Sequence, residues 1–184
     1  MKNILKLTLF SLLAIGLLAC GGNTKKLTQE DLKKAEESLF NEDRSIKVEE
    51  APKVAEKYCQ FVEQNPDDST AATWLFHAME INVMLKNADK SIELCNQLTE
   101  QYPDSEWAPR ALLYVGSFVY DDILNDTAQA HAMYQKLIDD YPNDRLVEDA
   151  KKSIEYLGLT SEQIMARIMM SNLEEVDIDD IAAQ

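Results

Sequence analysis

The side chains that most often carry acid–base or metal chemistry are scarce in this chain of 184 residues. It has two histidines, His77 and His131, and neither has a carboxylate or a cysteine at the spacing of a metal-ligand motif. His77 lies among apolar residues, whereas His131 begins an apolar stripe. We therefore assign both histidines to structural or surface roles and expect no metal site.

Nucleophilic chemistry has no recognisable arrangement either. The Gly-x-Ser-x-Gly motif that exposes a serine nucleophile is absent, and Ser117 follows one glycine without a second. The acidic pairs at 121–122 and 139–140 are most simply solvated helix faces or helix ends in so acidic a chain. A glycosidase would need two carboxylates across a cleft, and nothing in the sequence favours that pairing. We therefore predict that the protein is not an enzyme and uses no cofactor.

The elements that would position any such side chains are expected to be helices. Only two glycines, Gly116 and Gly158, lie beyond residue 22, while Ala, Leu, Glu, Lys and Gln are frequent. Clustered glycines that could cradle a phosphate are missing beyond the tether. The net charge is −15, and −17 once residues 1–19 with their two lysines are removed, which argues against nucleic acid as a partner because phosphate needs a basic surface. The composition predicts an all-α domain.

Residues 1–19 have the pattern of an export signal. Lys2 and Lys6 precede an apolar run from Leu7 to Ala19, and Cys20 follows directly. This run is shorter than the stretch of about 20 apolar residues that a membrane-spanning helix needs. A cleavable signal therefore fits the run better than a transmembrane anchor does.

Residues Leu17-Leu18-Ala19-Cys20 resemble the lipobox of bacterial lipoproteins. In that family the cysteine thiol is diacylated, and cleavage makes the cysteine the first residue of the mature chain. The resemblance implies a lipid anchor at Cys20, since two or three acyl chains hold a protein stably on a membrane. Gly21 in place of an aspartate implies sorting to the outer membrane, facing the periplasm. The alternative is an ordinary signal peptide followed by a chance cysteine.

The two remaining cysteines, Cys59 and Cys95, each fall in the apolar stripe of an expected helix. An oxidising periplasm would permit a disulfide between them. Their place in apolar stripes favours buried free thiols instead, and neither cysteine belongs to a CxxC pair.

Three similar segments ending in a proline turn mark an internal repeat. Pro66, Pro103 and Pro142 recur at nearly equal intervals, and each is flanked by Asp, Asn or Ser. Proline stops one helix, and the short polar side chains cap the next. The residues before each proline also align at spacings of three, as one inward helix face requires. Five and eight positions back they are Phe61 and Tyr58, Leu98 and Cys95, and Leu137 and Tyr134.

This unit of helix, short turn, helix and proline resembles the tetratricopeptide repeat. Val115-Gly116 reproduces the Leu-Gly pair of that family, whereas the segment from Phe76 to Met79 does not. The spacing exceeds the family's usual length of about 34 residues and is closer to the longer repeats of envelope proteins, such as the Tol-Pal-associated coordinator and the repeat lipoprotein of outer-membrane barrel assembly. The resemblance covers residues 48–158. It implies an α-solenoid of antiparallel helix pairs, a right-handed superhelix with capping helices at its ends.

These patterns divide the chain into a signal peptide (1–19), a lipidated cysteine and tether (20–27), a helical-repeat domain (28–174) and an acidic flexible tail (175–184). Thr28 with Asp31 and Thr160 with Gln163 have the spacing of helix-capping pairs, and Gly158 suits a helix end. We expect the terminal helices to cover the open ends of the stack. The expected helices span 28–40, 48–65, 69–86, 88–102, 106–122, 126–141, 144–157 and 161–174.

The repeat register also predicts which side chains line the concave surface of the stack. Apolar anchors ringed by polar groups on such a surface suit a peptide or a partner helix. Alternatively, the apolar residues pack as core against the terminal helices, and Trp107 clamps the neighbouring repeat. The expected surface comprises Thr73, Phe76, Glu80, Val83 and Met84 from one helix and Arg110, Leu113, Ser117, Tyr120 and Asp121 from the next.

The function expected from these features is that of a lipid-anchored, non-catalytic adaptor in the cell envelope, which binds a protein or peptide partner through its repeats. A subunit of an outer-membrane assembly or envelope-maintenance machinery is a special case. A lipoprotein that captures a glycan or peptide for a transporter is an alternative of a different class.

Overall fold

The computed structural model describes residues 26–170, so the expected signal peptide, Cys20 and the acidic tail lie outside the described residues. Within this range the chain is helical, and its only strand-like pairing is an isolated bridge between Phe40 and Ile46. The all-α prediction is therefore confirmed. The helices are α1 (Gln29–Ser38), α2 (Ala51–Gln64), α3 (Ala71–Met84), α4 (Ala88–Gln101), α5 (Trp107–Tyr114), η1 (Val115–Ile123), α6 (Thr127–Asp140) and α7 (Val147–Tyr156), followed by a helical segment at 161–170.

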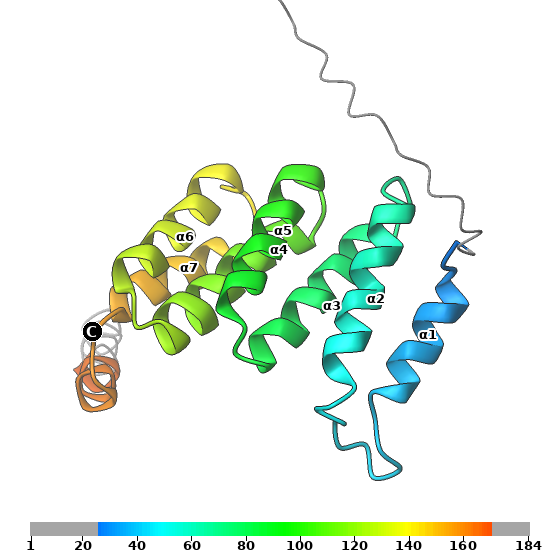
Figure 1. The fold of residues 1–184 in the computed structure, drawn as a ribbon. Helices are drawn as coiled ribbons and strands as arrows, with labels where there is room; N and C mark the ends of the chain where they lie inside the picture. The colour runs from blue at the N-terminus through cyan, green and yellow to red at the C-terminus, as the bar shows by residue number, and fades with distance from the viewer. Residues whose placement is uncertain (1–25, 171–184) are drawn as a thin grey trace, which may run out of the picture.

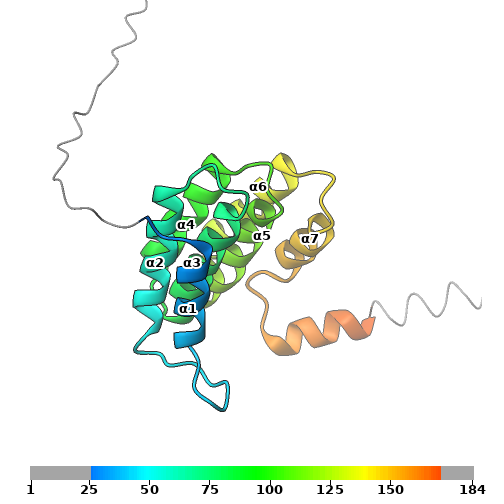
Figure 2. The same cartoon turned by 90° about the vertical axis from the view of Figure 1, so that its right-hand side faces the viewer.

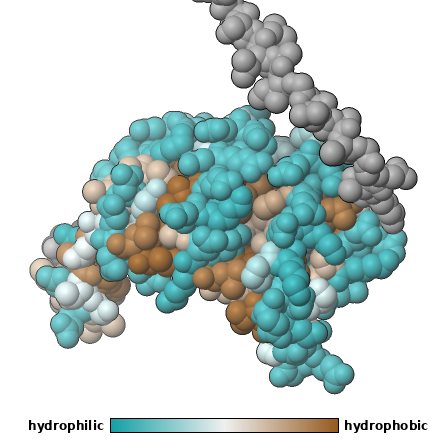
Figure 3. Space-filling view, in the orientation of Figure 1, coloured by the Kyte–Doolittle hydropathy of each residue, from teal (hydrophilic) through white to brown (hydrophobic). Residues whose placement is uncertain are grey.

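Successive helices pair into antiparallel hairpins that stack side by side into a solenoid (Figure 1). The first helices of the hairpins, α1, α3, α5 with η1, and α7, form a first layer, and α2, α4 and α6 form a second layer (Figure 2). The second layer presents a largely hydrophilic surface (Figure 3). Between the layers, one apolar core runs from Leu32 in α1 to Ala150 in α7. The predicted solenoid of helix pairs is thus confirmed.

The proline turns begin each new hairpin with the same hydrogen bond. In each turn, the polar side chain two residues after the proline accepts a bond from the backbone N–H two residues further on, an amide that the starting helix leaves unpaired. The donor–acceptor distances are 2.9 Å for Thr70 to Asp68, 3.0 Å for Trp107 to Ser105 and 2.8 Å for Leu146 to Asp144. This shared bond explains why Asp and Ser follow the prolines.

The turns at the opposite edge use left-handed backbone. Lys86, Asn125 and Gly158, each just after a first-layer helix, have φ values of 57°, 51° and 75°. Only glycine adopts this conformation without a steric cost, so Gly158 suits the position that the sequence predicted for it. Asn87 and Asp126 come next, and each side chain caps the following helix by accepting a backbone N–H three residues on.

Both predicted capping pairs are present. Thr28 and Asp31 form a reciprocal box at the start of α1, with bonds of 3.0 Å and 3.3 Å. Thr160 and Gln163 form the same arrangement before residues 161–170, with bonds of 2.8 Å and 3.3 Å. These local predictions are confirmed because each depends on residues only three positions apart.

The helix expected at 106–122 changes its hydrogen bonding part-way. It is α-helical from Trp107 to Tyr114 and then π-helical in η1, where bonds connect residues five apart. The backbone N–H of Leu124, for example, donates to the carbonyl of Val119 at 2.9 Å. A π-helix has more residues per turn than the 3.6 of an α-helix, so residues after Val115 point in different directions from those that α-helical spacing predicts.

The two ends of the stack differ. α1 covers one end through Leu32 and Ala35, which are buried against the core. At the other end, the expectation that residues from 161 onward cover the stack is wrong for the described part of that helix, because residues 161–170 project away from it (Figure 2). α7 closes this end instead. Its outward residues are charged and exposed, which makes it a polar cap: Glu148, Lys151, Lys152 and Glu155.

Gly116 allows a close helix crossing between η1 and α6. A Cβ added at Gly116 would lie 2.7 Å from Cε1 of the Tyr134 ring, closer than folded proteins tolerate. We expect Gly116→Ala to lower the free energy of unfolding by about 1–2 kcal/mol, because a clash of about 1–3 kcal/mol outweighs the roughly 0.5–1 kcal/mol that alanine gains in a helix. Urea unfolding followed by circular dichroism measures this loss.

The matched control removes the ring. In a Tyr134→Leu background the clash is gone, so the same Gly116→Ala change should become neutral or stabilising by up to about 1 kcal/mol. An equal loss in both backgrounds would show that the ring does not set this crossing.

Candidate partner-binding groove

The described surface has an apolar groove on the first layer, between α3 and the α5–η1 helix. Its volume is about 440 Å³. α3 and α5 supply most of the walls, and the turn before α7 closes one end through Leu146. The lining residues are Phe76, His77, Glu80, Trp107, Arg110, Leu113, Tyr114, Ser117, Phe118 and Leu146.

Aromatic rings form the floor of the groove. The Phe76 ring lies 4.7 Å from Trp107 and 6.0 Å from Tyr114, measured between centroids, and Tyr114 lies 4.6 Å from Phe118. Phe76 is 5% exposed, whereas Phe118 is 47% exposed. The cluster is therefore held by a buried ring on α3 and opens to solvent at Phe118, where a ligand could cover apolar area.

Charged groups stand at the rim. The Arg110 guanidinium lies 5.3 Å from the centroid of the Trp107 ring and 3.5 Å from Glu106. His77 Nδ1 lies 2.9 Å from Glu80 Oε2, three positions further along α3, so the expectation that His77 has no carboxylate at such a spacing is wrong. These pairs are partly exposed and contribute little stability, so they remain available to a ligand's polar groups.

Half of the predicted surface residues meet in this groove: Phe76, Glu80, Arg110, Leu113 and Ser117. Val83 and Met84 do not line it. Val83 is buried in the core at 8% exposure, because α3 lies between α2 and α4 and uses most of its circumference for packing. Met84 is exposed, but it stands at the end of α3, beyond the groove. Thr73, another predicted member, is absent from the lining.

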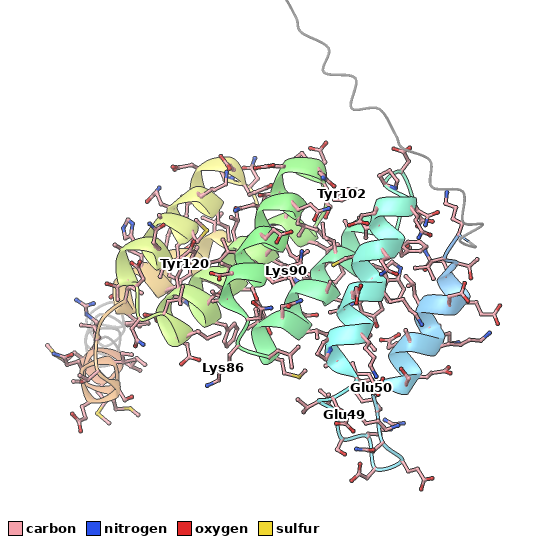
Figure 4. All side chains as sticks on the ribbon, viewed as in Figure 1. Glu49, Glu50, Lys86, Lys90, Tyr102 and Tyr120 are labelled. Carbon is pink, nitrogen blue, oxygen red and sulfur yellow. The ribbon has the colours of Figure 1, made fainter. Side chains whose placement is uncertain are left out.

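Tyr120 and Asp121 also lie elsewhere. Tyr120 appears between α4 and α6 in the view of the second layer (Figure 4), and burial together with the nearby Cys95 raises the pKa of its phenol. Asp121 borders a separate polar depression near α7. Both were placed by α-helical spacing, which fails after Val115 because η1 is π-helical.

The groove residues that the sequence did not indicate are mostly aromatic. Tyr114 and Phe118 are four residues apart, a spacing that predicts a shared helix face. Phe118 reaches the groove, however, through the π-helical hydrogen bonding of η1, which the sequence does not indicate. Trp107 was expected as a possible clamp between repeats, and its contact with Phe76 on α3 confirms that role. Leu146 comes from the turn before α7, so no local pattern indicates it.

The aromatic row continues beyond the groove toward α1. Trp74 lies 5.9 Å from His77 and 4.9 Å from Tyr58, again between centroids. Its indole N–H donates to Gln29 Oε1 at 2.9 Å, which ties α3 to α1. The first layer therefore offers a line of partly exposed rings that is longer than the groove itself.

Cys59 and Cys95 are free thiols, as predicted. Cys95 is 1% exposed, and burial raises its pKa to about 12. Burial also raises the pKa of Cys59, which is half-buried.

Among the described residues, no group of three or more His, Cys, Asp or Glu is placed to hold a metal ion. In the same part of the chain, no helix is both long and apolar enough to cross a membrane.

The raised thiol pKa values predict slow reaction with thiol reagents. Only the thiolate reacts, and a raised pKa lowers its fraction at every pH below that value. In a Cys20→Ser chain at pH 8, we expect Cys95 to react with Ellman's reagent only as fast as the protein unfolds, and Cys59 to react more slowly than a free thiol. Adding 6 M guanidinium should make both react at once. Rapid reaction of two thiols in the native protein would contradict the burial.

The stacked helix pairs define a helical-repeat protein. Residues 75–105 and 110–144 match the family model of the tetratricopeptide repeat. The matched segments hold most of α3 with α4, and most of α5, η1 and α6. Comparisons with curated proteins and with solved structures find no match.

Proposed function

We propose that this protein is a lipid-anchored scaffold of the bacterial envelope that holds a protein or peptide partner in its first-layer groove. The tetratricopeptide repeats support protein–protein interaction as the general function. The observation that carries the proposal is the aromatic groove between α3 and the α5–η1 helix, with its buried floor at Phe76 and its open ring at Phe118. The side chains there can bind and orient a chain, and they include no nucleophile with a paired base.

The groove suits a peptide with one or two large apolar side chains. Phe118 and the partly exposed Tyr114 would contact these side chains, and covering the exposed half of Phe118 would contribute about 1 kcal/mol. Arg110 and Glu80 stand at the rim and can pair with polar groups on either side of the anchor. This division into an apolar centre and a charged rim resembles known interfaces.

The proposed anchor would keep this groove near a membrane. Leu27 is fixed to the domain, since its backbone N–H donates to Gln64 Oε1 at 2.7 Å, and α1 is fixed to α3 through Gln29. Residues 21–27 separate Cys20 from the fold, and a chain of that length spans about 25 Å at most. A partner bound in the groove would therefore stay close to the membrane surface.

The anchor is tested by replacing Cys20 with serine. We expect the wild-type chain to incorporate an alkyne-palmitate label and to sediment with the outer membrane, and Cys20→Ser to lose both properties because it lacks the acylated thiol. A Cys59→Ser variant is the matched control and should retain the label. Equal labelling of the Cys20→Ser chain would disprove the anchor, and sedimentation with the inner membrane would disprove the sorting.

The groove is tested with two substitutions on one helix. Phe118 and Leu124 are 47% and 46% exposed, but only Phe118 lines the groove. In crosslinked envelopes, we expect Phe118→Glu to lose most of the proteins enriched by the tagged wild type, and Leu124→Glu to retain them. Quantitative mass spectrometry relative to Cys20→Ser measures the enrichment. The same enrichment with Phe118→Glu would exclude the groove as the binding site.

The repeat spacing favours one particular setting for this scaffold. The intervals between Pro66, Pro103 and Pro142 are longer than the usual repeat and closer to the repeats of lipoproteins that serve outer-membrane assembly and maintenance. In that setting, a large β-barrel protein or an envelope-maintenance complex would dominate the crosslinked set. Glycan or peptide capture for a transporter would instead appear as thermal stabilisation by such ligands.

A further inference from the structure

The helix at 161–170 exposes large apolar side chains although it is well formed. Thr160 and Gln163 cap it with a reciprocal pair of hydrogen bonds. Met165 and Met169, one turn apart on the same face, are 56% and 59% exposed, and Ile168 beside them is 39% exposed. We call Met165, Ile168 and Met169 the methionine stripe. Soluble proteins seldom place such side chains together on a projecting element without a binding role.

This helix does not pack on the stack as the second-layer helices do. In α4 and α6, the residue four positions after the N-cap is small and fully buried: Ser91 and Ala130 are both 0% exposed. The corresponding residue after Thr160 is Ile164, whose bulk prevents an equally close crossing. The outward face of α7, where a next helix would pack, carries exposed charges. The chain thus begins another helix at the repeat spacing, but this helix does not pack on α7 as α4 and α6 pack on the helices before them.

The sequence from residue 161 to residue 184 has six acidic residues and one basic residue. Arg167 is the only cation on the helix, and it already contacts Glu155, with its guanidinium 2.8 Å from the backbone carbonyl and 3.6 Å from the carboxylate. The sequence that follows, residues 171–184, has five acidic residues and no Lys or Arg. With a net charge of −15 on the whole chain, a second copy would be repelled, whereas a basic partner would be attracted.

We propose that helix 161–170 is a second interaction element, separate from the groove, whose methionine stripe binds the apolar face of a basic amphipathic helix in a partner protein. Methionine side chains are flexible and polarisable, so they adapt to apolar faces of varied shape. The net negative charge of the chain then favours partners with Lys or Arg beside the apolar residues. The protein would hold two binding elements in one chain, one between α3 and the α5–η1 helix and one beyond α7.

Methionine-methyl NMR on the mature chain tests this proposal directly. Residues 20–184 with Cys20→Ser keep six methionines, which can be labelled with ¹³C-methyl groups and assigned by single Met→Leu changes. Titration with a short helical peptide of Leu and Lys should shift the signals of Met165 and Met169 saturably, and leave buried Met79 unchanged. A Leu–Glu peptide of the same pattern should shift neither signal.

Two variants of the same helix provide the matched control. Met165→Glu with Met169→Glu should weaken peptide binding at least about tenfold, and Ala166→Glu, which adds a carboxylate to the same helix, should retain it. The groove variant Phe118→Glu should also retain it, which separates this result from the proposed groove function. Equal binding of the Leu–Glu peptide, undiminished binding by the double variant, or shifts of Met165 and Met169 on concentrating the protein alone would each overturn the proposal. The last result would identify a second copy as the occupant.

Discussion

The contact between Gly116 and the Tyr134 ring sets the spacing on which the packing of η1 against α6 depends. Without a Cβ at Gly116, the ring lies directly against the backbone of η1, and its hydroxyl shares a 3.0 Å hydrogen bond with the neighbouring Ser117. Helices in a close-packed interior cannot slide independently, so this crossing fixes how η1 lies on α6. It thereby determines where Ser117 and Phe118 stand relative to α3. One wall of the groove is thus positioned by a contact on another side of the same helix.

Features that depend on short stretches of sequence could be predicted. The proline turns and both capping pairs need only residues two to four apart, and the hydrogen bonds at Asp68 and Thr28 have the expected form. The direction of side chains after Val115 could not be predicted, because α-helical spacing does not describe a π-helix. The packing of residues 161–170 was also missed. The charged outward face of α7 indicates that no helix packs there, but the periodicity of apolar residues does not take these charges into account.

The groove shows the same division between local and long-range information. Phe76, Arg110 and Leu113 were found from their register within a repeat, which the two hairpins share. Leu146 enters from beyond both of these hairpins, and the depth of the groove depends on how Trp107 reaches Phe76 across two helices. Such contacts arise from the superhelical stacking of hairpins, and a repeat pattern in one sequence does not specify that geometry.

The location of α1 and of residues 161–170 at opposite ends of the stack has a mechanical consequence (Figure 1). If the chain is tethered before α1 and pulled by a partner at the far helix, tension runs lengthwise through every hairpin. Each repeat of a solenoid contacts only its neighbours, so under load the repeats can separate one at a time. α1, which contacts its neighbour α2 at fewer positions than α7 contacts α6, would detach first and lengthen the tether. The scaffold would then gain reach under load while the groove stayed folded.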